Sequence, residues 1–530
     1  MTRAQAPSRP RPGRPALAAG HAALLGVLHG AIVIVLVTAS LVSLQADEVQ
    51  AFHFAAAAET YVALFAFYRA YRLTGDAING LSLSMFVMLL LYPFHGVIMQ
   101  DSEVVLRLLG SERYRYFTYG LLVAVPGTWL IYRGFMSGRA GRFALAVERW
   151  SRVIDDRSPG IERKLWAFAA LAVGARVLQV ALGTGTYIDL EGTSSTTGSS
   201  AHFILSVLSS SSLITGLYLL ASGGRYKLRR RQLMGAAVIL MEAAWGGLFS
   251  GSRYLLFLPL LSAAAVLSMS VKALELRRLV LILVLFFAVL FPIATAYRNT
   301  YLSRLVDLQR EGLSASVVMS SIAATEVDEN TSEGWEEAIG LRFHALTSLA
   351  VIIRYTPERH PYIYGLPYLL LPLDILVPRV VWPDKPTIRE FATEFRFDYF
   401  ELDRGTRTAV KPSQFGELWA NLHLFGVLLG AWVWGRVLRF MYSFLFVGGR
   451  ASVFGAVTYA AALPWLITVL EGELVTGLAF VAKNLIVWLA WAWLLGTKRP
   501  TPPRPARRRA RWRGVEHAET RAALGATMAP

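Results

Sequence analysis

The feature that most constrains this chain is its series of long apolar runs. Each run has about 18–24 residues, enough to cross about 30 Å of hydrocarbon as a helix. Hydrophobic residues make up 55% of the 530 positions and charged residues only 17%, against about 45–50% and about 25% in typical soluble domains. We therefore predict an all-α polytopic membrane protein. About twelve transmembrane helices are expected, near residues 18–43, 51–70, 79–100, 115–134, 164–184, 201–222, 232–249, 253–271, 278–297, 414–436, 452–470 and 474–496.

The charges between these runs predict the orientation. With a cytoplasmic N-terminus, nearly every basic cluster falls inside, including "GGRYKLRRR" and the C-terminal "KRPTPPRPARRRARWRG". Short acidic loops such as "QADEVQ" and "EGE" then fall outside, as the positive-inside rule requires. The net charge of +17 is thus explained by membrane orientation, and no nucleic-acid partner is expected.

This alternation divides the chain into five parts. Both tails, a basic N-terminal one (1–17) and a basic, proline-rich and disordered one (497–530), are predicted to be cytoplasmic. Helices occupy 18–297 and 414–496, and a large outer loop occupies 298–413. Loops of this length are usually functional. We expect this one to contain amphipathic helices and, at "GLPYLLLPLDILVPRVVWPDKP", a proline-stiffened re-entrant segment too short to cross the membrane.

Cationic and acidic residues beside the outer surface are the first candidates for a site. Arg379 and Lys385 flank Trp382 on the stiff corner, where an arginine fork and a lysine charge suit a phosphate or carboxylate. Ordinary interfacial anchoring explains the same residues. Arg253 and Arg298, beside the eighth and ninth runs, have the same two interpretations.

"KPSQFGELWANLHLFG" opens the tenth run from the outside. Glu417 and Asn421 lie four residues apart and so share a helix face. A glutamate in this position could accept a proton from a sugar hydroxyl as a general base, or form an ion pair with a nearby arginine. Arg342, His344 and Arg354 lie along the edges of another helical stripe in the outer loop.

Ionisable residues within the predicted spans are a separate group. Such residues are costly in a membrane and mark either a cavity or a buried structural pair. They are Glu59, His95, Arg176, Glu242 and Lys483. The sequence has no cysteine, no Walker-type phosphate loop, no HExxH, no GxSxG and no DxD motif. We therefore expect no metal site and no cofactor.

The order "GSRYLLFL", arginine-bearing outer loop, "GLPYLLLPLDILVPRVVWPDKP" and "SQFGELWANLHLFGVLLG" resembles the Wzy-type polymerases of O-antigen and exopolysaccharide repeat units. The resemblance covers roughly residues 250–430. One departure is His423, which stands where a small residue is expected.

The resemblance implies a lipid-dependent, GT-C-like glycosyltransferase bundle in the bacterial inner membrane, with both termini cytoplasmic. The enzyme would transfer a growing glycan from undecaprenyl diphosphate to the non-reducing end of another lipid-linked unit, with a chain-length regulator as a possible partner. By position, Arg253, Arg342, Arg379 and Lys385 would anchor diphosphate or glycan, with Arg298 and Trp382 beside them. Glu417 would be the base, Asn421 would orient it, and His344 is the reserve choice.

Three other functions suit the same chain. A twelve-span transporter or flippase would place its site at the membrane midplane, on Glu59, Arg176, Glu242 or Lys483. An O-antigen ligase would share the donor but use a different acceptor. A non-catalytic scaffold for envelope assembly is the third alternative.

Overall fold

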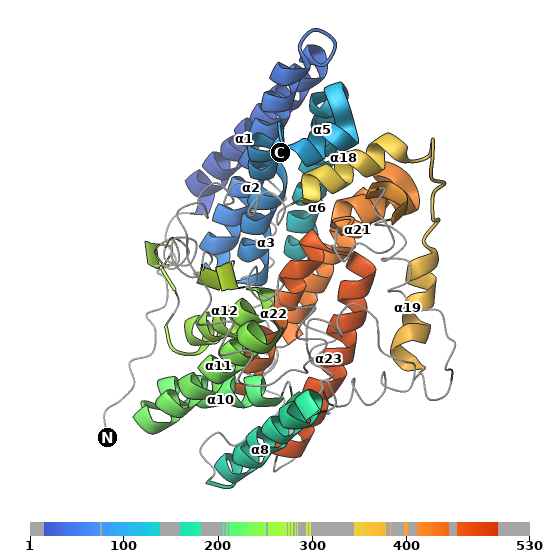
Figure 1. Cartoon of the computed structure of the whole chain (residues 1–530). Helices are drawn as coiled ribbons and strands as arrows, with labels where there is room; N and C mark the ends of the chain where they lie inside the picture. The colour runs from blue at the N-terminus through green and yellow to red at the C-terminus, as the bar shows by residue number, and fades with distance from the viewer. Residues whose placement is uncertain are drawn as a thin grey trace.

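The computed structural model describes residues 15–74, 77–137, 159–181, 205, 208–209, 211–250, 253–272, 274–275, 277–278, 281, 284, 293–294, 296–297, 344–377, 382, 397–400, 411–444 and 453–496. Every element within these ranges is helical (Figure 1). The first half contains α1 (Pro15–Ser43), α2 (Glu48–Thr74), α3 (Gly80–Leu89), η1 (Leu90–Phe94), α4 (His95–Met99), α5 (Glu103–Leu109), η2 (Gly110–Glu112), α6 (Arg113–Met136) and α8 (Pro159–Ala181). The rest comprises α10 (Ser211–Tyr226), α11 (Arg229–Ser250), α12 (Arg253–Ser270), α18 (Ala345–Tyr355), α19 (Leu366–Leu376), α21 (Gln414–Met441), α22 (Val453–Glu471) and α23 (Leu474–Leu495).

Five helical stretches of the described chain are long and apolar enough to cross a membrane. They are Glu48–Arg72, Gly80–Met99, Gln414–Phe444, Val453–Glu471 and Leu474–Leu495. Eleven of the twelve predicted runs overlap a described helix, and most of the ninth lies outside the described residues. The helical class is therefore confirmed, while twelve crossings and a GT-C-like bundle stay predictions.

Short helix α18 lies inside the bundle. Every residue from Ala345 to Ile352 is buried, and Leu346 packs against Gly96 of α4 and Gly120 of α6. Figure 1 shows α18 next to α5, α6 and α21, at the end of the molecule where α1 turns into α2. A segment of the predicted outer loop thus contributes to the core.

Helix α21 is not one straight rod. Leu422 (φ −143°, ψ 30°) and His423 (φ 55°, ψ −150°) have non-helical backbone angles. A Cβ atom added at Gly426 would lie 2.3 Å from the carbonyl oxygen of Leu418, yet residues eight apart in a straight helix are separated by about 12 Å. The chain therefore turns sharply at Leu422–His423, and the part after the turn packs against the part before it. His423, which departs from the pattern of the family that the sequence resembles, has a positive φ and provides the left-handed conformation of this turn.

The first part of α21 begins deep in the bundle. Phe415 contacts Gly127 of α6, which is fourteen residues, or about 21 Å of helix, past Arg113. The predicted span 414–436 is thus a short inserted helix followed by a longer one. Helix α19 is eleven residues long, about 16 Å, which agrees with the prediction that this segment is too short to cross.

The two ends of the bundle differ in charge. Near the α1–α2 turn and α5, acids outnumber bases: Asp47, Glu48, Asp101, Glu103 and Glu112 against Arg107, Arg113 and Arg115. The opposite end contains Arg133 at the end of α6 and the "RYKLRRR" connection of α10 and α11. Two contacts link α8 to other helices at this end. Arg231 of α11 pairs with Glu162 at 3.1 Å, and Lys164 Nζ donates to the Leu494 carbonyl of α23 at 2.9 Å.

The contact between α6 and the second part of α21 depends on two glycines. A Cβ atom at Gly435 would lie 2.1 Å from the Ile131 carbonyl oxygen, and one at Gly134 would lie 2.2 Å from that of Trp432. We expect Gly435→Ala to lower the free energy of unfolding by about 1–3 kcal/mol through overpacking. Thermal unfolding in detergent measures the effect.

Gly174→Ala is the matched control, because a Cβ atom at Gly174 of α8 meets no atom within 4 Å. This variant should be neutral or stabilising by about 0.5–1 kcal/mol, since alanine favours the helix. Equal thermal midpoints for Gly435→Ala and wild type would contradict the close helix contact.

Candidate functional site

Polar side chains gather where the first part of α21 meets α19 and the connection between α22 and α23. We call this group, Glu417, Glu473, Tyr368 and Lys411, the acidic junction. Ser413 starts α21 as an N-cap, with its hydroxyl accepting a hydrogen bond from the Gly416 amide at 3.2 Å. This cap fixes the first turn of α21, on which Glu417 lies.

Glu417 is 5% exposed, and its carboxylate holds the beginning of α23. Oε2 accepts a hydrogen bond from the Leu474 amide, and Oε1 accepts one from the Val475 amide at 3.3 Å. The first amides of a helix have no partner within that helix, and the helix dipole favours a negative group there. Glu417 is therefore an N-cap for α23 supplied by another helix. A carboxylate has about four acceptor positions, so two remain for other partners.

A second acid lies beside it. Glu473 accepts a hydrogen bond from the Thr476 hydroxyl at 2.6 Å and interacts electrostatically with Glu417. Burial raises the pKa of Glu473, while the Thr476 hydrogen bond and the charge of Lys411 oppose that rise. The Lys411 side chain passes over Gly472, where an added Cβ atom would lie 3.7 Å from its Nζ. The junction thus combines two acids with one cation.

Tyr368 of α19 completes the junction. Its buried hydroxyl lies beside Glu417 and makes no hydrogen bond of regular geometry. Burial, followed by the charges of Glu417 and Glu473, raises the pKa of Tyr368 well above its ordinary value. The phenol consequently keeps its proton and can donate a hydrogen bond.

Asn421 joins the end of the first part of α21 to the start of α19. Its Nδ2 donates to the Glu417 carbonyl at 2.8 Å, and its Oδ1 accepts from the Gly365 amide at 3.0 Å. Gly365 has φ +77°, which glycine adopts without strain. Asn421 therefore positions α19, and with it Tyr368, against the helix that carries Glu417.

His344 and Lys411 are also joined. The Lys411 amide donates to His344 Nε2 at 3.0 Å, and the Ser348 hydroxyl donates to the Lys411 carbonyl at 2.8 Å. His344 thus fixes the backbone that carries Lys411. Three predicted site residues, His344, Glu417 and Asn421, come together in this region.

The other predicted residues are not placed at the junction. Trp382 is described and 40% exposed, and Arg253 begins α12, where only its backbone is described. Arg298, Arg342, Arg379 and Lys385 lie outside the described residues.

Three junction residues were missed from the sequence. Glu473 is in "EGE", which we interpreted only as an acidic loop, and Lys411 lies two residues before "SQFGEL". Tyr368 lies in an apolar run and gives no signal by itself.

The intramembrane charges form separate groups. Arg176 of α8 pairs with Glu242 of α11 at 3.0 Å, and the Ser212 hydroxyl of α10 also contacts Glu242. The Thr128 hydroxyl donates to Glu59 at 2.6 Å, and His95 is hydrogen-bonded to Thr347 at 2.7 Å. Lys483 lies in α23, but its side chain is outside the description. In the described ranges no three His, Asp or Glu side chains converge as a metal site would require.

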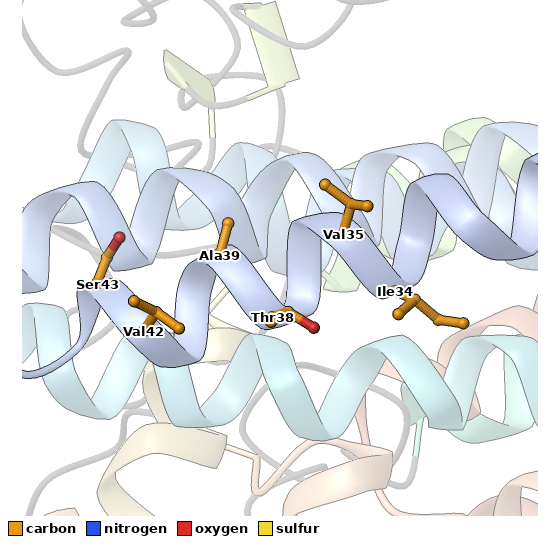
Figure 2. A pocket seen from close by; sticks show the side chains of 6 residues that line it. All are labelled: Ile34, Val35, Thr38, Ala39, Val42 and Ser43. Atoms are coloured by element: carbon orange, nitrogen blue, oxygen red, sulfur yellow. The ribbon is translucent and has the colours of Figure 1, made fainter.

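A surface hollow on α1 is unrelated to the junction. Figure 2 shows its lining, which is Ile34, Val35, Thr38, Ala39, Val42 and Ser43. All six residues come from one helix and none is ionisable. The hollow therefore offers no charged group for binding, and it lies on the Val27–Ser43 part of α1, a short apolar helical stretch.

Fold and junction together define an all-helical protein with membrane-length helices and a buried polar site between broken helices. The chain belongs to the family described as Domain of unknown function (DUF8712), whose model matches residues 180–456. The match includes Glu417 and Lys411 but ends before Glu473. No curated protein and no solved structure matches the chain.

The two hydrogen bonds of Asn421 give a direct test of the junction's architecture. Asn421→Ala leaves the Gly365 amide without its partner, at a cost of about 1–3 kcal/mol. We expect faster hydrogen exchange in peptides covering 362–376, measured by mass spectrometry. Asn421→Asp keeps the acceptor for Gly365 and should protect this segment better than alanine. Equal exchange in wild type and Asn421→Ala would contradict the tie to α19.

The raised pKa of Glu473 predicts how stability depends on pH. The native protein keeps this proton to higher pH than the unfolded chain, whose carboxyl has a value near 4.5. Its contribution to stability is therefore greatest at low pH and is lost as pH rises through the raised value. Glu473→Gln should flatten that part of the curve of thermal midpoint against pH. Glu103→Gln, at an exposed position of α5, should keep the wild-type slope, and an unchanged slope in Glu473→Gln would contradict the burial of this acid.

Proposed function

We propose that the protein is a membrane polysaccharide polymerase. In this proposal it extends a glycan carried on undecaprenyl diphosphate, at the outer face of the bacterial inner membrane, with both termini in the cytoplasm. The observation that carries the proposal is the acidic junction. A buried carboxylate, a neutral phenol and a lysine meet there on segments that the polymerase-like part of the sequence supplies, between 344 and 421.

The charge difference between the two ends of the bundle supports the orientation. Basic connections such as "RYKLRRR" lie at one end, and positively charged loops are retained in the cytoplasm. Helix α23, which Glu417 caps, has its other end beside α8, where Lys164 donates to the Leu494 carbonyl. Helix α8 in turn reaches the "RYKLRRR" connection through the Glu162–Arg231 pair. In this proposal lipid-linked repeat units reach the junction from the outer side, where they are polymerised.

The proposed reaction needs a base and a stabilised leaving group. A hydroxyl at the non-reducing end of the acceptor attacks the anomeric carbon of the donor. The bond from that carbon to the diphosphate oxygen breaks, and undecaprenyl diphosphate leaves with the bonding electrons. Glu417 accepts the hydroxyl proton, held in place by the Leu474 and Val475 amides. Lys411, with Arg379 and Lys385 as further candidates, offsets the charge of the diphosphate.

Purified protein mixed with lipid-linked repeat units tests the proposal by the appearance of longer glycans. Glu417→Gln should lower the extension rate by about 10²- to 10⁴-fold, as expected for loss of a general base. Arg379→Ala should abolish extension without reducing expression. Glu471→Gln, at the last residue of α22, is the matched control and should stay active.

Thermal midpoints separate loss of chemistry from loss of folding, because glutamine keeps one acceptor for the α23 amides. Full activity of both Glu417→Gln and Arg379→Ala would show that the site is misplaced. A well-folded wild type that extends no lipid-linked donor would overturn the polymerase itself.

A transporter or flippase is the second candidate. It is favoured by the Arg176–Glu242 pair, which joins α8 and α11 beside Ser212 of α10, because buried charges of this kind often mark a transport pathway. Flux of a lipid-linked glycan across vesicles that is lost in Glu242→Gln, without glycan extension by wild type, would support this alternative.

A further inference from the structure

A second polar group lies inside the bundle and has no part in the proposed reaction. It consists of Glu59 on α2, Tyr92 in η1, Thr128 on α6, Ser413 at the N-cap of α21 and Gln414 at its first position. We call it the Glu59 cluster. All five side chains are fully buried, at 0% exposure. They come from four helical elements, so only the folded bundle brings them together.

The cluster leaves several polar atoms without partners. Glu59 Oε1 accepts the Thr128 hydroxyl hydrogen at 2.6 Å, but Oε2 has no partner. Both amide atoms of Gln414 are buried and unpaired. The Tyr92 hydroxyl lies near Ser413 and the Phe415 amide but forms no hydrogen bond of regular geometry. Buried polar groups in native proteins nearly always have a partner, which can be an internal water.

The depth of these polar groups in the bundle makes their lack of partners more unusual. Glu59 lies eleven residues after the start of α2, about 16 Å along the helix and therefore near the middle of a membrane-length segment. Phe415 packs on Gly127, the neighbour of Thr128, so Gln414 reaches this depth as well. Tyr92 lies in a π-helical turn that contains Pro93, and such turns are frequent at functional sites.

The charge balance around Glu59 favours a neutral carboxyl. None of the ion pairs found among the described residues includes Glu59. Helix α3 has no titratable residue, α1 contributes His29, which contacts Tyr61, and the arginines of α6 lie at its two ends, at 113, 115 and 133. An isolated carboxylate in such surroundings would be very costly, whereas a protonated one needs only hydrogen-bond partners.

We propose that the Glu59 cluster is a buried proton-binding site. Glu59 holds a proton on its carboxyl group, and internal water links this group to Tyr92 and Gln414. The proton exchanges with solvent along this hydrated path. One carboxyl group, three hydroxyls and an amide suit water and a proton, whereas a divalent cation normally takes several carboxylates. The site is independent of the proposed polymerase reaction.

Infrared spectroscopy of the full chain in lipid nanodiscs tests the proposal. A protonated carboxyl group has a carbonyl stretching band that an ionised one lacks. Glu59→Gln should remove one component of this band, and that component should shift in D₂O as its proton exchanges. Thr128→Val keeps the shape of the side chain but removes the hydrogen bond to Glu59, so it should move the same component to higher frequency. Glu242→Gln is the matched control, because Glu242 is paired with Arg176.

Three results would overturn the proposal. Identical bands in wild type and Glu59→Gln would show that Glu59 is ionised. A component that never shifts in D₂O would show that its proton does not exchange. A component that disappears when sodium replaces a bulky organic cation would identify a sodium site. If Glu59→Gln does not fold, an unchanged band in Thr128→Val would contradict the assignment by itself.

Discussion

The structure depends on satisfying the backbone of helices that begin and end inside the bundle. At membrane depth no bulk water is available for a free amide or carbonyl group. Helices α18, α21 and α23 all begin in the interior, where hydrogen bonds to side chains hold the chain at or near each beginning. Ser413 caps α21, Glu417 caps α23, and His344 with Ser348 holds the peptide groups of Lys411. These bonds bring the residues of the acidic junction together. The site therefore results from the hydrogen bonds that satisfy the ends of the broken helices.

The sequence predicted the helices better than their ends. Apolar runs correspond to long helices because hydrophobic length alone determines where a chain can cross. The turn at Leu422–His423 was not predicted, since a histidine with positive φ has no pattern in the sequence and "NLHLFGVLLG" continues the apolar run. Glycines 426 and 430, which allow close packing on Leu418, were the available signal.

The candidate site was predicted in part for a similar reason. Glu417, Asn421 and His344 were noticeable as polar residues at the edges of apolar runs. Their roles could not be predicted, because Glu417 binds α23 and Asn421 binds α19, contacts between segments more than fifty residues apart. Tyr368 and Glu473 become candidates only when α19 and the α22–α23 turn are seen beside Glu417. The short stretch 411–417 contributes residues to both the junction and the Glu59 cluster. Both sites therefore depend on how this stretch packs.

The absence of cysteine from the chain allows a direct measurement of this packing. A Cβ atom at Gly416 would lie 3.7 Å from the Leu349 Cα, within reach of the geometry of a disulfide. The double variant Leu349→Cys, Gly416→Cys should therefore form a disulfide in the membrane under mild oxidation, detected as a cross-linked peptide by mass spectrometry. Leu349→Cys with Gly174→Cys should form none. Two free thiols in the first pair, in a folded protein, would contradict the insertion of α18 and the start of α21 into one core.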